Sequence, residues 1–517
     1  MERPHPAPER PSNGRPLPPT LAVVDIGSNT ARLVIFEAIG AAVRAIYETK
    51  EVPRLGAHPA VGGRLSDEAI GRGLAMARRF AGILDRRKVG RTIVVATSAV
   101  RDAPNGPDFA REVERATGLS VRTLSGTEEA RYGYLGVASA WELSNDLVLD
   151  LGGGSLQLVD VHEGALRNSV SLPLGALRLS QRFFEHDPPK HRELEALEAH
   201  VRVTVRNAME AFGGKGYRLF GIGGTVRALA RAAIEFREYP VRRVHGYPLY
   251  DHDIEALGEL LGDMPSAKRR AIAGIGADRA DVVLAGIVVF QELLRAAGAE
   301  RIVVSGTGIR EGVALEAIGA QLPAPAEVLA ERSAVAASAS FAFSIEHGRA
   351  VAETALALYR ALGALFDGAG EGTARALQVA AWMHDAGLSV DLWNHAHHSA
   401  YLVQNYPIWG LDQREILLAS MATYLHEGDA PPSEWKKGYL PILRPPDLLL
   451  AAQLGAILEV AEILSPAHPK FSLAGTGRML SVSFSSPTDT PLSPRWAEKV
   501  RKPMERAFGI EVRARDA

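Results

Sequence analysis

The chain has 517 residues, of which 47% are hydrophobic and 23% charged, and its formal net charge is −2. This composition is ordinary for a globular protein and argues against a broad nucleic-acid-binding face, and the lack of cysteine excludes disulfides, zinc–thiolate sites and cysteine nucleophiles. No apolar run reaches the ~20 residues of a membrane span. The first 19 residues are rich in proline and arginine, so we expect a disordered tail and a cytoplasmic location.

Residues 20–316 alternate predicted strands with predicted helices in two consecutive blocks. In the first block, residues 20–135, the predicted strands are 22–24, 33–37, 92–96 and 121–124, and the main helix is 66–86. In the second block, residues 136–316, strands over 147–150, 156–161, 217–222 and 301–305 alternate with helices over 191–212, 226–235 and 280–297. This alternation predicts two α/β domains whose ligands bind at the strand ends.

The pattern changes to almost continuous helix from about residue 320 onward. The proline-containing stretch 322–327 marks the boundary, and we expect a helical domain over residues 320–470. A small α/β segment with strands near 480–484 and 510–513 is expected over residues 471–517. The predicted fold class is therefore α/β: two duplicated domains, a mostly helical domain and a short α/β tail.

Two short segments, one in each α/β block, predict a phosphate-binding cleft. They are Asp25-Ile-Gly-Ser-Asn-Thr30 and Asp150-Leu-Gly-Gly-Gly-Ser155, and each follows an apolar run typical of a buried strand. A strand that ends in such a turn brings backbone N–H groups toward a phosphate, and an aspartate at the strand end can hold Mg²⁺. Because each half of the region carries one copy, the sequence predicts a duplicated fold that holds phosphate from two sides.

These segments belong to a series of motifs that resembles the exopolyphosphatase and guanosine pentaphosphate phosphohydrolase family. The other motifs are Ala96-Thr-Ser-Ala-Val-Arg-Asp-Ala103, Leu124-Ser-Gly-Thr-Glu-Glu-Ala-Arg131, Gly221-Ile-Gly-Gly-Thr225 and Ser305-Gly-Thr-Gly-Ile-Arg-Glu-Gly312. The resemblance covers residues 20–316 and continues more weakly to about 465. It implies the ribonuclease H-like fold shared with actin, sugar kinases and Hsp70-type ATPases, together with a homodimer.

Hydrolysis of a phosphoanhydride requires a base that activates water, and the sequence offers two adjacent glutamates for it. Glu128 and Glu129 begin a predicted helix, and because neighbouring helical residues point about 100° apart only one can face the cleft. In the family the second glutamate is catalytic, so the resemblance assigns Glu129 as the base and leaves Glu128 to cap the helix.

The remaining site residues follow from the two loops, from the Gly221–Thr225 loop and from one arginine. Asp25 and Asp150 are the expected Mg²⁺ ligands. Arg101 has a planar charged fork that suits a phosphate. The other expected phosphate-binding residues are Gly27, Ser28, Asn29, Thr30, Gly152, Gly153, Gly154, Ser155, Gly223, Gly224 and Thr225.

Gln157 is a departure from the family pattern, in which a glutamate usually stands at this position. A glutamine can coordinate Mg²⁺ through its carbonyl oxygen, but it adds no charge and cannot act as a base. We therefore expect weaker metal affinity or altered metal geometry. The substitution also keeps open a protein that binds its ligand better than it cleaves it.

The helical domain carries its own histidine pattern. His347, the pair His384-Asp385, His398 and His426 resemble in order the HD-type phosphohydrolase fold, in which His, His-Asp and a later Asp ligate a divalent metal. The predicted helix 454–464 offers Glu462 but no aspartate, and in the family this domain is commonly a relic. The sequence therefore favours a helical domain without bound metal.

The sequence leads us to expect a Mg²⁺-dependent exopolyphosphatase that releases terminal phosphate from inorganic polyphosphate. Removal of the 5′ γ-phosphate from guanosine pentaphosphate is the alternative within the same class. A polyphosphate or alarmone sensor with weak catalysis is the alternative from another class, and a kinase is disfavoured because Glu129 lies in a water-activating motif. The expected partners exclude nucleic acid and membranes.

Overall fold

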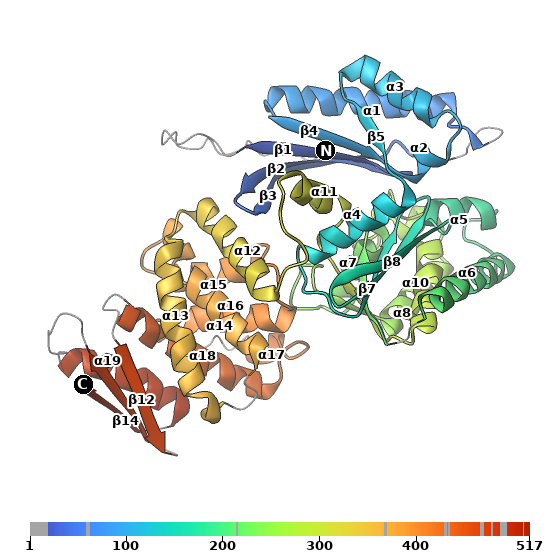
Figure 1. The fold of residues 1–517 in the computed structure, drawn as a ribbon. Helices are drawn as coiled ribbons and strands as arrows, with labels where there is room; N and C mark the ends of the chain where they lie inside the picture. Colours follow the sequence, from blue (N-terminus) through green and yellow to red (C-terminus); the bar gives the residue numbers. More distant parts are fainter. Residues whose placement is uncertain are drawn as a thin grey trace.

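The computed structural model describes residues 19–516 except 58–62, 214–215, 367–369, 429–431, 433–434, 466–469, 477–478, 486–493 and 510. The tail expected over residues 1–19 thus lies outside the described residues, apart from Pro19. Two α/β units lie beside each other, and a helical unit joins them to a small sheet at the end of the chain (Figure 1). No helix among the described residues combines the length and apolarity needed to cross a bilayer.

The first sheet has the strand order β3-β2-β1-β4-β5, in which β1, β2 and β3 are antiparallel and β1, β4 and β5 are parallel. Its strands are β1 (Thr20–Ile26), β2 (Ala31–Ile39), β3 (Ala42–Glu51), β4 (Arg91–Ala96) and β5 (Val121–Thr123). Helices α1 (Asp67–Arg86), α2 (Ser98–Asp102) and α3 (Gly106–Thr117) accompany it. The Ser66 side chain caps α1 by accepting from the N–H of Ala69.

The second sheet has the order β10-β11-β9-β6-β7-β8. Its strands are β6 (Asp146–Leu151), β7 (Leu156–His162), β8 (Ala165–Leu172), β9 (Arg218–Ile222), β10 (Pro248–Tyr250) and β11 (Arg301–Val304). The helices of this unit are α5 (Ala176–Phe183), α6 (His191–Phe212), α7 (Gly224–Phe236), α8 (Asp251–Gly262), α9 (Ser266–Arg269) and α10 (Val283–Ala297). Residues of these helices and of the sheet form the largest apolar core.

The two sheets repeat one arrangement, as the sequence predicts. In each, an antiparallel three-stranded meander (β1-β2-β3 or β6-β7-β8) is followed by a parallel strand beside its first member. The turns also match: the N–H of Gly27 donates to the oxygen of Thr30 at 3.0 Å, and the N–H of Gly152 donates to that of Ser155 at 3.0 Å. The duplication therefore extends from the sheet order to the hydrogen bonds of the loops.

Helices α4 (Gly126–Ala138) and α11 (Ile309–Ala317) connect the two units. Although α11 follows a strand of the second sheet, it packs with α4 on the first, where Val313 and Ala314 share a core with Val23 and Phe36 (Figure 1). The backbones nearly touch: a Cβ on Gly136 would lie 2.0 Å from the carbonyl oxygen of Gly308. Only a residue without a side chain permits this approach.

We expect Gly136→Ala to lower stability because the added methyl group meets backbone that cannot rotate away. The cost of such overpacking is about 1–3 kcal/mol, which a lowered thermal unfolding midpoint would reveal. Gly71→Ala is the matched control: Gly71 also lies within a helix, α1, but a Cβ added there would meet no atom within 4 Å. That change should leave the midpoint unchanged or raise it, since alanine favours helices. Equal effects of the two changes would contradict the packing argument.

The helical domain consists of α12 (Ala326–Phe341), α13 (Ile345–Ala361), α14 (Glu371–Met383), α15 (His395–Asn405), α16 (Gln413–Leu425), α17 (Trp435–Gly438) and α18 (Pro445–Leu464), with short 3₁₀ turns at Gly363–Leu365 and Ala386–Ser389. Its core is separate from those of the sheets. The chain then forms β12 (Lys470–Thr476), β13 (Met479–Ser485), α19 (Pro494–Phe508) and β14 (Glu511–Asp516), whose strands pair in the order β12-β13-β14. The sequence predicts β13 and β14 but not β12.

Candidate active site

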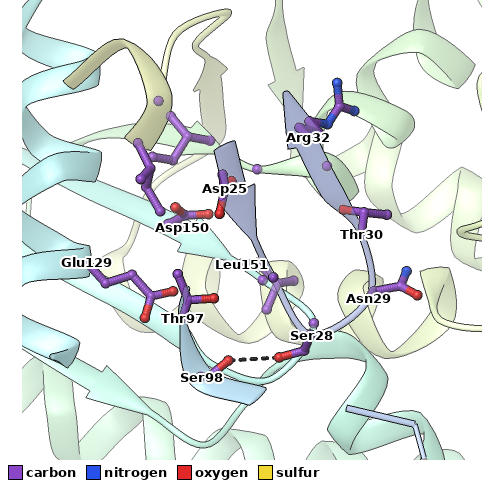
Figure 2. Close-up of a pocket in the computed structure, with 18 of the residues that line it drawn as sticks. Asp25, Ser28, Asn29, Thr30, Arg32, Thr97, Ser98, Glu129, Asp150 and Leu151 are labelled. Atoms are coloured by element: carbon purple, nitrogen blue, oxygen red, sulfur yellow. Dashed lines mark hydrogen bonds between the residues drawn. The ribbon is translucent and has the colours of Figure 1, made fainter. Parts of the chain in front are cut away.

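Asp25 and Asp150 face each other across the cleft between the two α/β units (Figure 2). Asp25 lies near the end of β1 and Asp150 near the end of β6, so the duplication places them at equivalent positions. Both line one polar cavity, and a Cβ on Gly223 would lie 2.8 Å from a carboxylate oxygen of Asp150. Gly223 has φ of +95°, a left-handed conformation that glycine adopts without strain.

The two glycine-rich loops line this cavity from both units. Residues Gly27, Ser28, Asn29 and Thr30 line it from the first unit, and Gly152 and Gly153 line it from the second. The loops touch: a Cβ on Gly153 would lie 3.1 Å from the Asn29 backbone nitrogen, and one on Gly154 only 2.6 Å from Ser28 Oγ. Ser28 Oγ also lies 2.9 Å from Ser98 Oγ.

Glu129 and Glu128 occupy different environments at the start of α4. Glu129 is buried and lines the cavity on the side of Asp150 and Thr97 (Figure 2). Glu128 is half-exposed and forms an ion pair with Arg122. Its carboxylate accepts from the N–H of Ser125 at 2.9 Å, and the two residues form a capping box. Only Glu129 is therefore available to a ligand in the cleft.

Arg101 binds Glu129 instead of lining the cavity. One guanidinium nitrogen of Arg101 donates to Glu129 Oε2 at 2.6 Å and to the carbonyl oxygen of Leu124 at 3.1 Å. The structure thus places it behind the glutamate, where it orients the carboxylate. Its expected contact with a phosphate stays a prediction.

Three further residues of the expected phosphate set lie beside the cavity without lining it. Gly154 packs against Ser28 of the first loop. Ser155 is buried, and its Oγ accepts from Gln157 Nε2 at 2.9 Å. Thr225 is fully buried near the start of α7, and its hydroxyl has no hydrogen-bond partner among the described residues. Gly223 and Gly224 of the same segment do line the cavity.

Four arginines at the cavity are missed by the sequence analysis: Arg32, Arg227, Arg279 and Arg310. Arg310 lies 3.8 Å from an oxygen of Asp25, and Arg227 donates to the carbonyl oxygens of Ser305 and Thr307 at 3.0 Å each. Arg310 lies in the motif Ser305–Gly312, so the sequence alone could have identified this arginine. Arg32, Arg227 and Arg279 come from separate segments that only the fold brings together.

Burial raises the pKa values of all three carboxyl groups in the cavity. It raises the pKa of Glu129 to about 7, since the opposing effect of Arg101 is only partial and the charges of Asp150 and Asp25 raise the pKa further. Burial, with repulsion from Asp25, raises the pKa of Asp150 to about 6. Burial likewise raises the pKa of Asp25, against the attraction of Arg310. Ionised together, these groups repel one another, and a cation between them would relieve that repulsion.

The paired carboxylates fit a divalent cation that prefers oxygen ligands. Asp25 and Asp150 point at one another from strand ends, and the cavity around them is lined by hydroxyl, amide and backbone groups and by the four arginines named above. Mg²⁺ takes one or two carboxylates and completes its shell with water and phosphate oxygens. The residues present therefore fit Mg²⁺.

Gln157 lies directly opposite Asp150 in the pairing of β6 with β7. Its Nε2 donates to the hydroxyl oxygens of Ser155 at 2.9 Å and Ser171 at 3.1 Å, while its buried Oε1 has no partner within the described part of the chain. The equivalent residue in the first unit is Arg32, which faces Asp25. Position 157 is thus adjacent to the expected metal ligand without lining the cavity.

Ion pairs and a hydrogen bond join the two units beside the cleft. Arg54 binds Asp281 through two contacts of 2.7 and 3.2 Å, and the Asn29 side chain donates to the backbone carbonyl oxygen of Asp278 at 2.9 Å. Arg178 of the second unit lies 2.5 Å from Asp102 of the first. These contacts fix the two units against each other next to the cavity.

Comparisons with known proteins agree with this fold. A family model described as the Ppx/GppA phosphatase family matches residues 34–320, and a model of domain III of these phosphatases matches residues 329–442. Exopolyphosphatase 1 of Mycobacterium tuberculosis is 30% identical over 328 residues, which cover 61% of this chain and 92% of that protein. A guanosine-5′-triphosphate,3′-diphosphate pyrophosphatase of Aeromonas hydrophila is 27% identical over 482 residues, 90% of this chain and 93% of that protein.

Solved structures support the same architecture. The crystal structure of an exopolyphosphatase from Cytophaga hutchinsonii aligns with a TM-score of 0.55 and 26% identity, covering 59% of this chain and 100% of that one. The fold predicted from the sequence, two duplicated actin-like α/β domains with a helical domain after them, is confirmed. Because the first family model alone spans more than half of the sequence, the chain belongs to the Ppx/GppA phosphatase family.

Proposed function

We propose that this protein is an exopolyphosphatase, a phosphoanhydride hydrolase that releases terminal phosphate from inorganic polyphosphate with the help of Mg²⁺. The observation that carries the proposal is the placement of buried Glu129 in a cavity that also holds the opposed pair Asp25 and Asp150 and two glycine-rich loops. Water activation, metal binding and phosphate binding are then available within one cavity.

The residues divide the work of hydrolysis as follows. The loops Gly27–Thr30 and Gly152–Gly153 bind and orient the terminal phosphates, and Arg310 and Arg279 stabilise their charge. Asp25 and Asp150 would hold Mg²⁺, and the ion would supply positive charge against the phosphate oxygens. Glu129 takes a proton from the attacking water, and Arg101 keeps its carboxylate pointing into the cavity.

Contact between the two loops supports cleavage at the chain end. Gly153 and Gly154 pack directly on Ser28 and Asn29, and we infer that this contact closes the end of the cavity where the terminal phosphate would lie. A polyphosphate chain must then enter from the opposite side, with its end foremost. This geometry favours release of single phosphates over cutting within the chain.

An assay with three substrates tests the proposal. The purified protein with Mg²⁺ is given long-chain polyphosphate, guanosine pentaphosphate and ATP separately, and phosphate release is followed. We expect the highest kcat/KM for polyphosphate. A higher value for guanosine pentaphosphate would establish the alternative activity, which the Aeromonas hydrophila relative favours because it matches 90% of this chain. Tight binding of either ligand without turnover would instead favour a sensor.

We expect Gln157→Glu to lower the Mg²⁺ concentration needed for half-maximal activity. The new carboxylate would lie beside Asp150 and could accept hydrogen bonds from the Ser155 and Ser171 hydroxyls that now serve as acceptors. An added negative charge near a cation strengthens the attraction. The measurement is phosphate release against Mg²⁺ concentration, and an unchanged or raised requirement would mean that position 157 does not act on the metal.

Three accompanying properties belong to the same proposal. Mg²⁺ is the metal that an all-oxygen ligand set favours among abundant cellular cations. A cytoplasmic location fits the lack of cysteine, and a homodimer follows from the family resemblance alone. Inorganic polyphosphate is the proposed partner, with guanosine pentaphosphate as the alternative, and neither nucleic acid nor a membrane is proposed as one.

A further inference from the structure

A cluster of histidines and carboxylates lies inside the helical domain, far along the chain from the cleft. Its members come from five helices or their ends: His347, His384, Asp385, His395, His426 and Glu462. The sequence analysis favoured a relic at His384 and Asp385, and it singled out His398 instead of His395. In the structure the imidazole rings of His347 and His384, of His384 and His426, and of His395 and His426 lie 5.3, 5.6 and 5.4 Å apart.

Backbone carbonyl groups fix the orientation of three of these rings. The Nδ1 atoms of His384, His395 and His426 lie 2.8, 3.2 and 2.6 Å from the carbonyl oxygens of residues 381, 392 and 423. A carbonyl oxygen can only accept, so each Nδ1 carries the hydrogen, and in a neutral ring Nε2 then carries a lone pair. This is the arrangement by which metal-binding histidines are usually held.

The three Nε2 atoms are buried and unsatisfied. Those of His384, His395 and His426 have no hydrogen-bond partner among the described residues, and the side chains of His384 and His426 are 1% and 0% exposed. A histidine that merely fills a core normally pairs both ring nitrogens, because a buried unpaired acceptor is costly. Three such lone pairs in one cluster indicate a place where an electron-pair acceptor, such as a metal ion, can bind.

Asp385 stands between the rings at distances that suit a shared cation. Its oxygens lie 3.7 Å from His347 Nε2, 3.6 Å from His384 Nε2 and 3.9 Å from His395 Nε2. These separations are too long for hydrogen bonds. Two ligands that each bind one ion at about 2.0–2.2 Å lie roughly 3.0–3.5 Å apart, so a small inward shift would complete a coordination shell.

We propose that the helical domain holds a divalent transition-metal ion between His347, His384 and Asp385, whose possible ligand atoms lie within 4.8 Å of one another, with His395, His426 and Glu462 as the further ligands beside them. Glu462 lies 3.7 Å from His426 Nε2 and occupies the place where the sequence pattern lacks an aspartate. Imidazole ligands favour ions such as Fe²⁺, Co²⁺, Ni²⁺ or Zn²⁺ over Mg²⁺. The chain would thus carry two cation sites of different chemistry.

The proposed ion has access to solvent. A surface pocket lined by His426, Glu427, Glu459, Glu462 and Lys499 reaches the cluster from outside. The ion can therefore enter the folded protein, and a coordination position on that side can take water or an anionic ligand. The site does not depend on the proposed activity of the cleft, because it shares no residue with it.

Cobalt binding to the full-length protein tests the proposal. The protein carrying Asp25→Asn and Asp150→Asn, which disables the cleft as a metal site, is stripped with a chelator and titrated with Co²⁺. We expect binding of at least about one equivalent, with visible absorption bands typical of nitrogen ligands, and no displacement by millimolar Mg²⁺. Binding of less than about a tenth of an equivalent would overturn the proposal.

Variants of the cluster supply the second arm of the test. Adding His384→Ala and His426→Ala should abolish the Co²⁺ bands, whereas His252→Ala with His398→Ala, two histidines outside the cluster, should preserve them. Circular dichroism checks that each protein is folded. If the alanine variant fails to fold, Asp385→Asn decides instead, since it removes the charge at nearly constant shape and should weaken Co²⁺ binding at least ~10-fold. Unchanged binding in either folded variant would overturn the assignment.

Discussion

Replacing Glu129 by Gln should lower the rate of phosphate release by at least ~10²-fold, the scale of a lost general base. The amide keeps the size of the carboxylate and can still accept from Arg101, so the variant should remain folded and bind substrate nearly as well. Because binding is retained, the loss should appear in kcat and hardly in KM. Steady-state kinetics with polyphosphate, together with a thermal unfolding curve, make this measurement.

Glu128→Gln is the matched control, since it changes the same group one residue away. Glu128 caps α4 and is half-exposed, so its replacement should cost less than about 1 kcal/mol in stability and leave turnover within a few-fold of the original. Similar losses of activity from the two changes would contradict the assignment of the base to Glu129.

The features that the sequence predicted are those that local chemistry determines. A strand that ends in Asp-x-Gly forms the same turn wherever it occurs, so the loops after Asp25 and Asp150 could be recognised and paired. Helix geometry allows only one of Glu128 and Glu129 to face the cleft, the family resemblance indicated Glu129, and the capping box of Ser125 with Glu128 agrees with that choice. Such signals lie within a few residues of one another and require no knowledge of the tertiary fold.

What the sequence could not predict depends on contacts between distant segments. Helix α11 follows β11 but packs on the first sheet, and this crossing brings Arg310 to Asp25. Arg101 has the right chemistry for a phosphate contact, yet the fold turns it toward Glu129. In the helical domain, His395 and not His398 joins the histidine cluster because its face of α15 meets α16. The sequence near these histidines does not reveal which face that is.

Asp150→Asn should affect activity and stability in opposite directions. Loss of this carboxylate should reduce Mg²⁺-dependent phosphate release by at least ~10²-fold, because the metal keeps only one of its two protein anions. In the absence of metal the same change should raise the unfolding temperature at pH 8, since Asp150 is buried beside Asp25 and its pKa is raised to about 6. A carboxyl whose pKa is raised on folding contributes stability below its unfolded pKa and loses it as pH rises through the folded value.

The pH dependence separates this explanation from a general effect of the substitution. With chelator present, the variant should be more stable than the original protein at pH 8 by a few degrees, and this advantage should disappear toward pH 4, where Asp150 is protonated. Addition of Mg²⁺ at pH 8 should then stabilise the original protein but hardly the variant, since bound metal favours the folded state. Asp108→Asn, which changes an exposed carboxylate on α3, should alter neither activity nor the metal response. If Asp150→Asn lowered the unfolding temperature in chelator at pH 8, the carboxylate would be stabilising the metal-free cleft, and its role as one half of a repelling metal-binding pair would be wrong.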